Sequence, residues 1–414
     1  MSTVAFFWTR LCIVVGKNPT SLKQIREYLA WSQDRPIDIY IIERHSALAE
    51  EGPAQKAQVE DQVKTVMELL GPHMKRWSLL YMKLKHSSSL PRPRIDLTGH
   101  ASQLITLELE CAVDDISILP DPEEGSHTLG EFHTPALARL SMCGLHFRDA
   151  YLQPFPQVPM PEALNDITIS HYGAHRAPLA LVDLLRCLVS CRRLSHVGLA
   201  SLTLDCSYTG PPVIPSPGVR VSDVAWDYLH FTDMPCEVIG ECNRLLARPY
   251  VETVSYSRCT LGTPRSGFFQ SFYLRADEID SPTTLFALLA AIRGPYSCSE
   301  ATFTHCAGLK PALWKMLMLY PDLTWFCSHL KSLKIEGCHE ITSSDLRMAL
   351  QARREKHAET GFVEEGHPAF VVTSICELEV EDCCELAQED KEWLDANVGW
   401  VSWDDWEGGF ARGK

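Results

Sequence analysis

The feature that most constrains this chain is a short alternating stretch, Leu330–Cys338, which reads L-x-x-L-x-I-x-x-C. Alternation with a period of two places Leu333 and Ile335 on one face of a strand and the polar Lys334 and Glu336 on the other. The cysteine ends the strand at a turn, and a helical stretch follows it. A strand–turn–helix unit of this kind has one apolar face to bury, so it predicts packing against further copies of itself.

The same three apolar positions recur along most of the chain. Strand units aligned on them begin at Met74, Leu104, Leu137, Leu164, Leu194, Val221, Val251, Phe269, Cys298, Leu330 and Ile375. Most of the intervals are 27 to 33 residues. The cysteine position adds independent support, because it is occupied by Cys259, Cys306, Cys338 and Cys383 in four of these units. With 16 cysteines in 414 residues, fewer than one such match is expected by chance.

The spacing and the pattern are typical of leucine-rich repeats. We therefore expect a mixed α/β fold, a leucine-rich-repeat solenoid (horseshoe) with parallel inner strands and outer helices and loops. The predicted parts are residues 1–45 as an N-terminal cap, residues 46–384 as a solenoid of about eleven irregular repeats, and residues 385–414 as an acidic, Trp-rich C-terminal cap or tail.

The N-terminal part reads as strand, helix and strand. The first strand lies within Phe7–Val15, the helix runs from Ser21 to about Trp31, and the second strand covers Ile37–Ile41. An amphipathic helix over Val59–Leu70 then precedes the first repeat, because its apolar residues recur at helical spacing.

Three stretches in the N-terminal part resemble a known family. Phe7–Ile13, Leu22–Ser32 and Arg35–Ile39 are similar to the segment that directly follows the F-box in fungal F-box-like proteins with degenerate leucine-rich repeats. The resemblance implies the substrate-recognition part of an F-box-type ubiquitin-ligase subunit. We expect the F-box itself to be absent from this chain, so the adaptor of a cullin ligase is an expected partner only where an F-box lies upstream.

The formal charge of −15 argues against a general nucleic-acid binder, which needs clustered Lys and Arg to neutralise phosphates. Twelve Asp and Glu and one Lys lie between Glu377 and Glu407, which gives this segment −11 and leaves −4 for the rest. Four of the ten Trp lie in the same region, at positions 393, 400, 403 and 406. This segment is either a solvated cap over the last repeat or a docking motif for a partner.

The cysteines are dispersed and include no C-x-x-C pair, so neither a zinc ribbon nor a thioredoxin-type site is indicated. We expect buried thiols in a reducing compartment, cytoplasmic or nuclear. No apolar run reaches the ~18 residues of a membrane span, and we expect no membrane association. Residues 83–94 read as a basic Ser/Pro surface loop, with contact to nucleic acid as the less favoured alternative.

Catalytic signatures are missing from the sequence. There is no phosphate-binding glycine loop, no G-x-S-x-G and no H-E-x-x-H. His127, Glu131 and His133 form a small cluster, but a metal site there needs at least one more ligand. We expect no enzyme activity, no cofactor and no metal.

A binding surface remains as the functional hypothesis. In a horseshoe, polar residues between the apolar strand positions line the concave face. The candidate partner-binding residues are Arg139, His196, Asp227, Tyr273, Arg275, Lys334 and Glu336. Tyr and Arg are enriched at binding hot spots, so Tyr273 and Arg275 come first, with ordinary surface residues as the alternative. The expected chain is a monomer that binds a protein, either as the ligase receptor or as a scaffold unrelated to ubiquitin.

Overall fold

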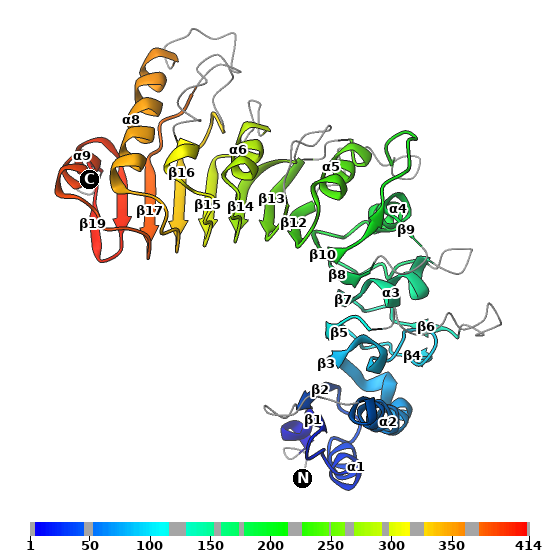
Figure 1. The fold of residues 1–414 in the computed structure, drawn as a ribbon. Coiled ribbons are helices and arrows are strands. Elements are labelled where there is room, and N and C mark those ends of the chain that lie inside the picture. The colour runs from blue at the N-terminus through cyan, green and yellow to red at the C-terminus, as the bar shows by residue number, and fades with distance from the viewer. Residues whose placement is uncertain are drawn as a thin grey trace. The chain divides into compact units, whose positions relative to one another are not determined.

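The computed structural model describes residues 5–44, 53–115, 130–152, 159–173, 178–213, 226–247, 250–260, 269–291, 298–314, 327–360 and 372–411. It is a mixed α/β structure whose strands form large, mostly parallel sheets with helices beside them (Figure 1). Contacts within the chain define two compact units, Met1–Tyr208 and Thr209–Lys414. None of the helices within the described ranges is long and apolar enough to cross a membrane.

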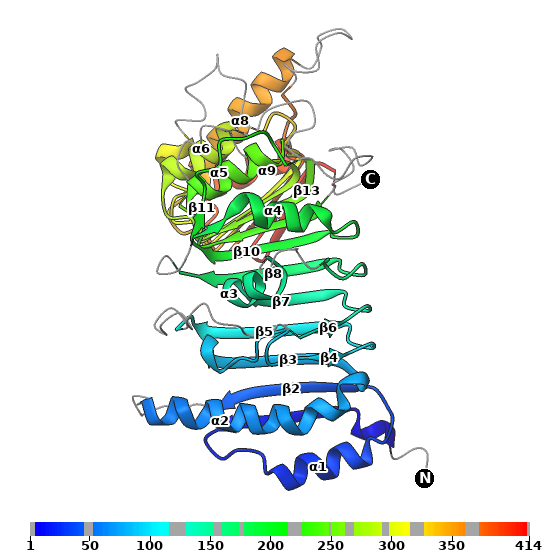
Figure 2. The ribbon, with the colours of Figure 1, turned by 90° about the vertical axis from the view of Figure 1, so that its right-hand side faces the viewer.

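The main sheet of the first unit is parallel throughout its described strands (Figure 2). In spatial order these are β1 (Arg10–Gly16), β2 (Ile37–Arg44), β3 (Trp77–His86), β5 (Thr106–Val113), β7 (Arg139–Cys143), β8 (Asp166–Tyr172) and β10 (His196–Leu202). Its helices are α1 (Leu22–Trp31), α2 (Pro53–Leu70), α3 (Gly144–Phe147) and α4 (Leu181–Ser190). Two short strand pairs lie outside this sheet, β4 (Gly99–His100) with β6 (Phe132–His133), and β9 (Leu179–Ala180) with β11 (Leu204–Asp205).

Short helical turns complete the first unit. They are η1 (Ala5–Trp8), η2 (Gly71–Arg76), η3 (Ser87–Ser89) and η5 (Arg148–Leu152). The predicted strand–helix–strand order of the N-terminal part is confirmed, and the Ser21 side chain caps α1 by accepting from the Gln24 backbone N–H. The predicted basic loop at residues 83–94 is wrong in its first part, because β3 extends to His86 and η3 follows.

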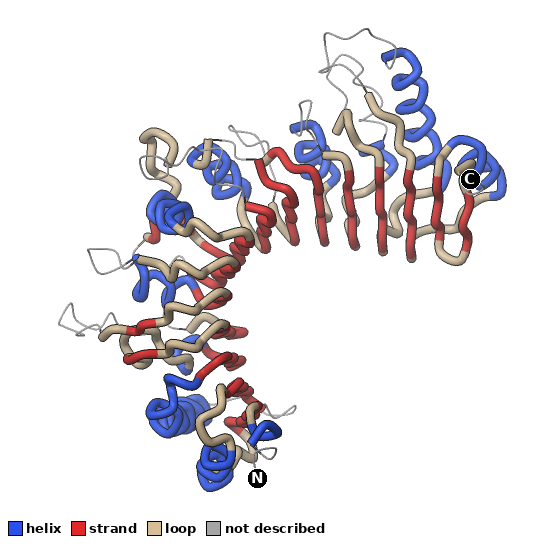
Figure 3. The backbone as a smooth tube through the Cα atoms, turned by 180° about the vertical axis from the view of Figure 1, so that it is seen from behind, coloured by secondary structure: helices blue, strands red, loops and turns tan. Residues whose placement is uncertain are grey.

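The main sheet of the second unit consists of parallel strands closed by one antiparallel strand. In order these are β12 (Trp226–Thr232), β13 (Tyr250–Ser257), β14 (Gln270–Asp277), β15 (Glu300–Thr304), β16 (Ser332–Glu336), β17 (Glu377–Glu381), β18 (Trp400–Trp403) and the antiparallel β19 (Trp406–Gly408). Its described helices are α5 (Cys236–Leu245), α6 (Pro282–Ala291), α8 (Ser343–Thr360) and α9 (Gln388–Asn397). In this unit the helices lie on one side of the strands (Figure 3).

The core of the second unit is built from two rows of apolar side chains that continue from strand to strand. Residues aligned in the first row are Leu229, Val254, Leu274, Ala301, Leu333, Leu378 and Val401, and those in the second are Phe231, Tyr256, Ala276, Phe303, Ile335, Val380 and Trp403. All of them are buried. The last pair shows that the ladder continues into β18, within the segment that was expected to form a cap or tail.

The cysteine position has a structural explanation. A residue in the left-handed region follows each main strand of the second unit, for example Arg258, His305 and Gly337. In β13, β15, β16 and β17 a cysteine comes directly after it. The Cys306 Sγ–H donates to the Ala276 carbonyl oxygen at 3.4 Å, and the Cys306 backbone N–H donates to the Cys338 Sγ at 3.3 Å. The cysteines thus satisfy backbone groups of the turn that ends each strand.

Two predicted registers are wrong. The strand expected to begin at Val221, which lies outside the described residues, instead uses Trp226, Leu229 and Phe231. In β14 Leu274 is inward and Phe269 is buried, as predicted, but Phe272 is exposed, and the other two inward positions are Ser271 and Ala276. The small Ser271 and Ala276 give a weaker apolar signal than the nearby phenylalanines, which favoured the shifted alignment.

The first repeat is also shifted, because the pairing of β2 with β3 is irregular at Ile37 and Asp38. Leu80 and Met82 are the buried positions there, in place of Leu79. The remaining aligned strands have their three apolar residues buried, as predicted.

Candidate functional site

The predicted binding residues do not form one group. Arg139 and His196 lie on β7 and β10 of the first unit, whereas Asp227, Tyr273, Arg275, Lys334 and Glu336 lie on β12, β14 and β16 of the second.

In the first unit, Arg139 and His196 flank one carboxylate. Asp166 on β8 is in register with both residues, and its Oδ2 lies 3.2 Å from the Arg139 Nε. His196 Nδ1 lies 2.8 Å from the Ser195 Oγ. These contacts engage one of the Arg139 donors and one ring nitrogen of His196 within the chain.

In the second unit, polar and aromatic residues occupy the face of the sheet opposite the helices, here called the open face (Figure 1). Strand pairing aligns two rows on it. The first is Tyr228, Thr253, Tyr273, Glu300, Ser332, Glu377 and Trp400, and the second is His230, Ser255, Arg275, Thr302, Lys334, Glu379 and Ser402. The rows run from aromatic residues at β12–β14 to acidic residues at β16–β17.

At the aromatic end of the open face lie Tyr228 and Tyr273 of the first row, and Phe272 contacts the Tyr273 ring; these three residues are here called the aromatic patch. Tyr228 is 41% exposed and Phe272 is 39% exposed, so both present apolar surface to solvent. The Phe272 and Tyr273 rings meet edge to face with centroids 4.9 Å apart. Thr253, which separates the two tyrosines in their row, is buried, so the patch presents neighbouring rings around a small covered side chain.

Arg275 lies beside the aromatic patch and is exposed. Its neighbours in the row are Ser255 and Thr302, and no ion pair to it is found among the described residues. The pKa of the Tyr273 phenol is raised, mainly by the charge of Glu300. Tyr273 therefore remains a neutral hydroxyl at physiological pH, able to donate a hydrogen bond.

The acidic end is formed by Glu300, Glu336, Glu377, Glu379 and Glu381, here called the acidic row. Lys334 lies among them, and its Nζ is 2.7 Å from Glu379, 3.7 Å from Glu336 and 3.8 Å from Glu381. The hydrogen bond to Glu379 is the main reason why the Lys334 pKa is raised. Lys334, which was predicted as a binding residue, is thus ion-paired within the chain. The acidic row keeps a net negative charge around it.

Sequence reasoning missed Tyr228, His230 and Phe272 because of the register errors in β12 and β14. Asp227 was selected for the same reason; it is half-buried beside Tyr228. The correct signal was present, since Trp226-x-x-Leu229-x-Phe231 fits the three-position template and would have placed Tyr228 and His230 on the open face.

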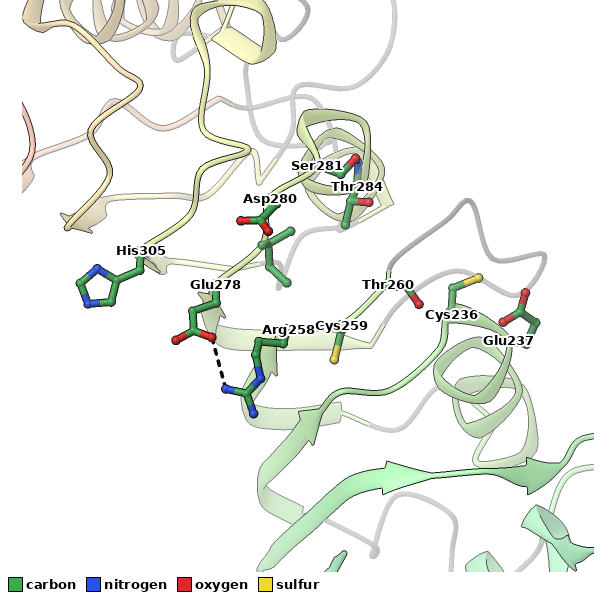
Figure 4. Close-up of a pocket in the computed structure, with 11 residues that line it drawn as sticks. Cys236, Glu237, Arg258, Cys259, Thr260, Glu278, Asp280, Ser281, Thr284 and His305 are labelled. Atoms are coloured by element: carbon green, nitrogen blue, oxygen red, sulfur yellow. Dashed lines mark hydrogen bonds and ion pairs between the residues drawn. The ribbon is translucent and has the colours of Figure 1, made fainter. Parts of the chain in front are cut away.

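A second feature of this unit is a cavity of about 810 Å³ at the carboxyl ends of the strands (Figure 4). Arg258 forms one side, with its guanidinium 2.9 Å from Asp233 and 3.3 Å from Glu278. Cys236 and Glu237 at the start of α5 and Ser281 and Thr284 at the start of α6 complete it. The two carboxylates hold the Arg258 pKa well above its usual range. The guanidinium is therefore held in ion pairs within the chain.

Of the two thiols that line this cavity, Cys259 is not an activated nucleophile. Burial raises the pKa of the Cys259 thiol to about 11, so it is protonated at neutral pH, and the thiolate is the reactive form. Among the residues that the structure describes, no three His, Cys, Asp or Glu are placed to hold a metal ion. Of the predicted cluster His127, Glu131 and His133, His127 lies outside the described residues.

No family model, no curated protein and no solved structure matches this chain.

Proposed function

We propose that this chain is a leucine-rich-repeat module that binds a protein partner through the open face of its second unit. The parallel ladder, the two apolar rows and the turn cysteines support the repeat assignment. The observation that carries the binding proposal is the aromatic patch beside the exposed Arg275, since exposed aromatic and arginine side chains dominate protein–protein interfaces.

The charge of the open face narrows the type of partner. A segment with an apolar or aromatic side chain would bury the aromatic patch, and Lys or Arg residues nearby would neutralise the acidic row. Complementary charge raises association rates and sets the register of the complex. We infer a partner segment that is basic and partly apolar.

The resemblance to F-box-like proteins suggests that this partner is a ubiquitin-ligase substrate. The alternative is a scaffold role unrelated to ubiquitin. A pull-down of the tagged endogenous protein, scored for the cullin-ligase adaptor, separates the two. Recovery of the adaptor supports the ligase role. Complexes that contain the partner protein but lack the adaptor would support the scaffold role.

The binding surface is tested by placing a photo-crosslinking amino acid at Tyr273 in cells, identifying the captured protein and then measuring its affinity with purified components. We expect Phe272→Ala and Tyr273→Ala each to weaken binding by about 1–3 kcal/mol. Met348→Ala is the matched control, because Met348 is also 41% exposed but lies on α8, on the helix side of the sheet. Equal effects of all three variants would contradict the proposal.

A further inference from the structure

The first unit contains a separate cavity of about 890 Å³ between helix α2 and residues 88–98. This volume lies within the ~300–1,000 Å³ range of small-molecule sites. Val63 of α2, Met74 of η2 and Leu90 and Leu97 of the facing segment give it apolar walls. The cavity is independent of the open face of the second unit.

The residues that line this cavity include two whose buried hydrogen-bond donors have no partner in the part of the chain that the structure describes. Trp77, at the start of β3, is 0% exposed, and no acceptor is found for its Nε1–H; Ser89, in η3, is 5% exposed, and its Oγ also has no partner among the described residues. A buried donor left unsatisfied costs about 1–3 kcal/mol. An oxygen acceptor brought into the cavity would remove that cost for the donor that it reaches, because a carbonyl oxygen accepts hydrogen bonds from N–H and O–H groups alike.

The charged residues at the cavity are balanced. Its lining includes the cations Lys56, Lys64 and Arg92 and the carboxylates Glu60, Glu68 and Asp96. Several are already paired, as shown by the 3.1 Å contact between Arg92 and Asp96 and the 2.5 Å contact between Lys56 and Asp115. A balanced lining gives no electrostatic preference for an anion or a cation, so the site favours an uncharged ligand.

We propose that this cavity binds a neutral, largely apolar small molecule whose carbonyl-type oxygen accepts hydrogen bonds from Trp77 and Ser89. The apolar body of the ligand would be buried against Val63, Met74, Leu90 and Leu97, where area removed from water contributes about 25 cal/mol per Å². The oxygen would distinguish the ligand from a hydrocarbon of the same shape.

Benzophenone and diphenylmethane are suitable probes, because they have the same two rings and differ by the carbonyl oxygen. With the full-length protein we expect benzophenone to bind about two- to tenfold more tightly, the ratio that corresponds to a net hydrogen bond. Ser89→Ala removes one donor with little change in packing, and it is expected to reduce this ratio without altering the affinity for diphenylmethane. Irradiation of bound benzophenone is expected to label residues 53–74 and 88–98.

Blocking the cavity provides a second test. Ala57 lines it, whereas the adjacent Gln58 is exposed on α2 and does not. Ala57→Trp is expected to abolish binding of both probes, and Gln58→Trp, the matched control, to leave it unchanged. Equal affinity for the two probes, labelling elsewhere in the chain, binding that survives Ala57→Trp, or no saturable binding of benzophenone would each overturn the proposal.

Discussion

Glu300 lies where the aromatic patch meets the acidic row. It is in register with Tyr273 on one side and Ser332 on the other. Its pKa is raised, first by partial burial and then by the negative charge of Glu377. A carboxylate that is ionised at neutral pH in such surroundings reduces the stability of the free protein, and a cation from a partner would relieve this cost.

The pH dependence of stability tests this view of Glu300. Its folded-state pKa is higher than its unfolded-state pKa, so the folded protein binds more protons in the interval between them and loses stability as the pH rises through it. Glu300→Gln is therefore expected to raise the urea midpoint at pH 7 and to have a smaller effect near pH 4, where the native carboxyl is protonated. The same variant should weaken the binding of a basic partner segment. Glu252→Gln, an exposed carboxylate of β13 outside the acidic row, is the control; an identical pH profile for both variants would contradict this account.

Among the secondary-structure elements, the strand registers were predicted correctly where all three template positions hold large apolar residues. The prediction failed where an inward side chain is small, and it could not detect contacts between residues distant in sequence. The strands β5, β8, β13, β16 and β17 have the predicted registers. β14 was shifted because Ser271 and Ala276 fill inward positions. The role of Arg353 had no local signal: this α8 residue is buried and donates to the carbonyl oxygens of Cys327 and Thr373, which are distant in sequence.

The candidate sites were less predictable than the strands. Arg275 and Tyr273 were found because their types are enriched at interfaces, but the capture of Lys334 by Glu379 depends on the pairing of β16 with β17. The cavity beside α2 depends on the packing of residues 88–98 against that helix. Neither arrangement leaves a periodic pattern in the sequence.

The turn after β16 has no room for a side chain at Gly337. Gly337 has φ +63°, and a Cβ there would lie 2.0 Å from the His305 Nδ1. Gly337→Ala should therefore destabilise the protein by about 1–3 kcal/mol through backbone strain and this clash. The His305→Ala background should recover part of the loss, because it removes the ring. Urea denaturation of the two single variants and the double variant measures the coupling; strictly additive effects would show that the ring is not involved.

For the whole molecule, the two compact units and the contacts between successive strands predict that each region is stabilised mainly by its immediate neighbours in the sheet. Each main strand is hydrogen-bonded to its immediate neighbours in the sheet. Perturbations are then expected to decline with distance along the ladder.

Hydrogen exchange measured by mass spectrometry tests this expectation. Gly337→Ala should accelerate amide exchange in β15, β16 and β17 and leave β1, β2 and β3 close to the native rate. The reason is that these two groups of strands share no hydrogen bonds. A uniform acceleration across both units would instead indicate a single cooperative transition.

The reversed direction of β19 has a further consequence. Parallel strands that end in an open edge offer a template on which another chain can add a strand and begin a filament. Here β19 pairs back on β18 over Val401–Trp403, and at three residues it leaves only a short edge, followed by Gly409 at φ +109°. We therefore expect this fold-back to disfavour the addition of a strand from another copy at β19.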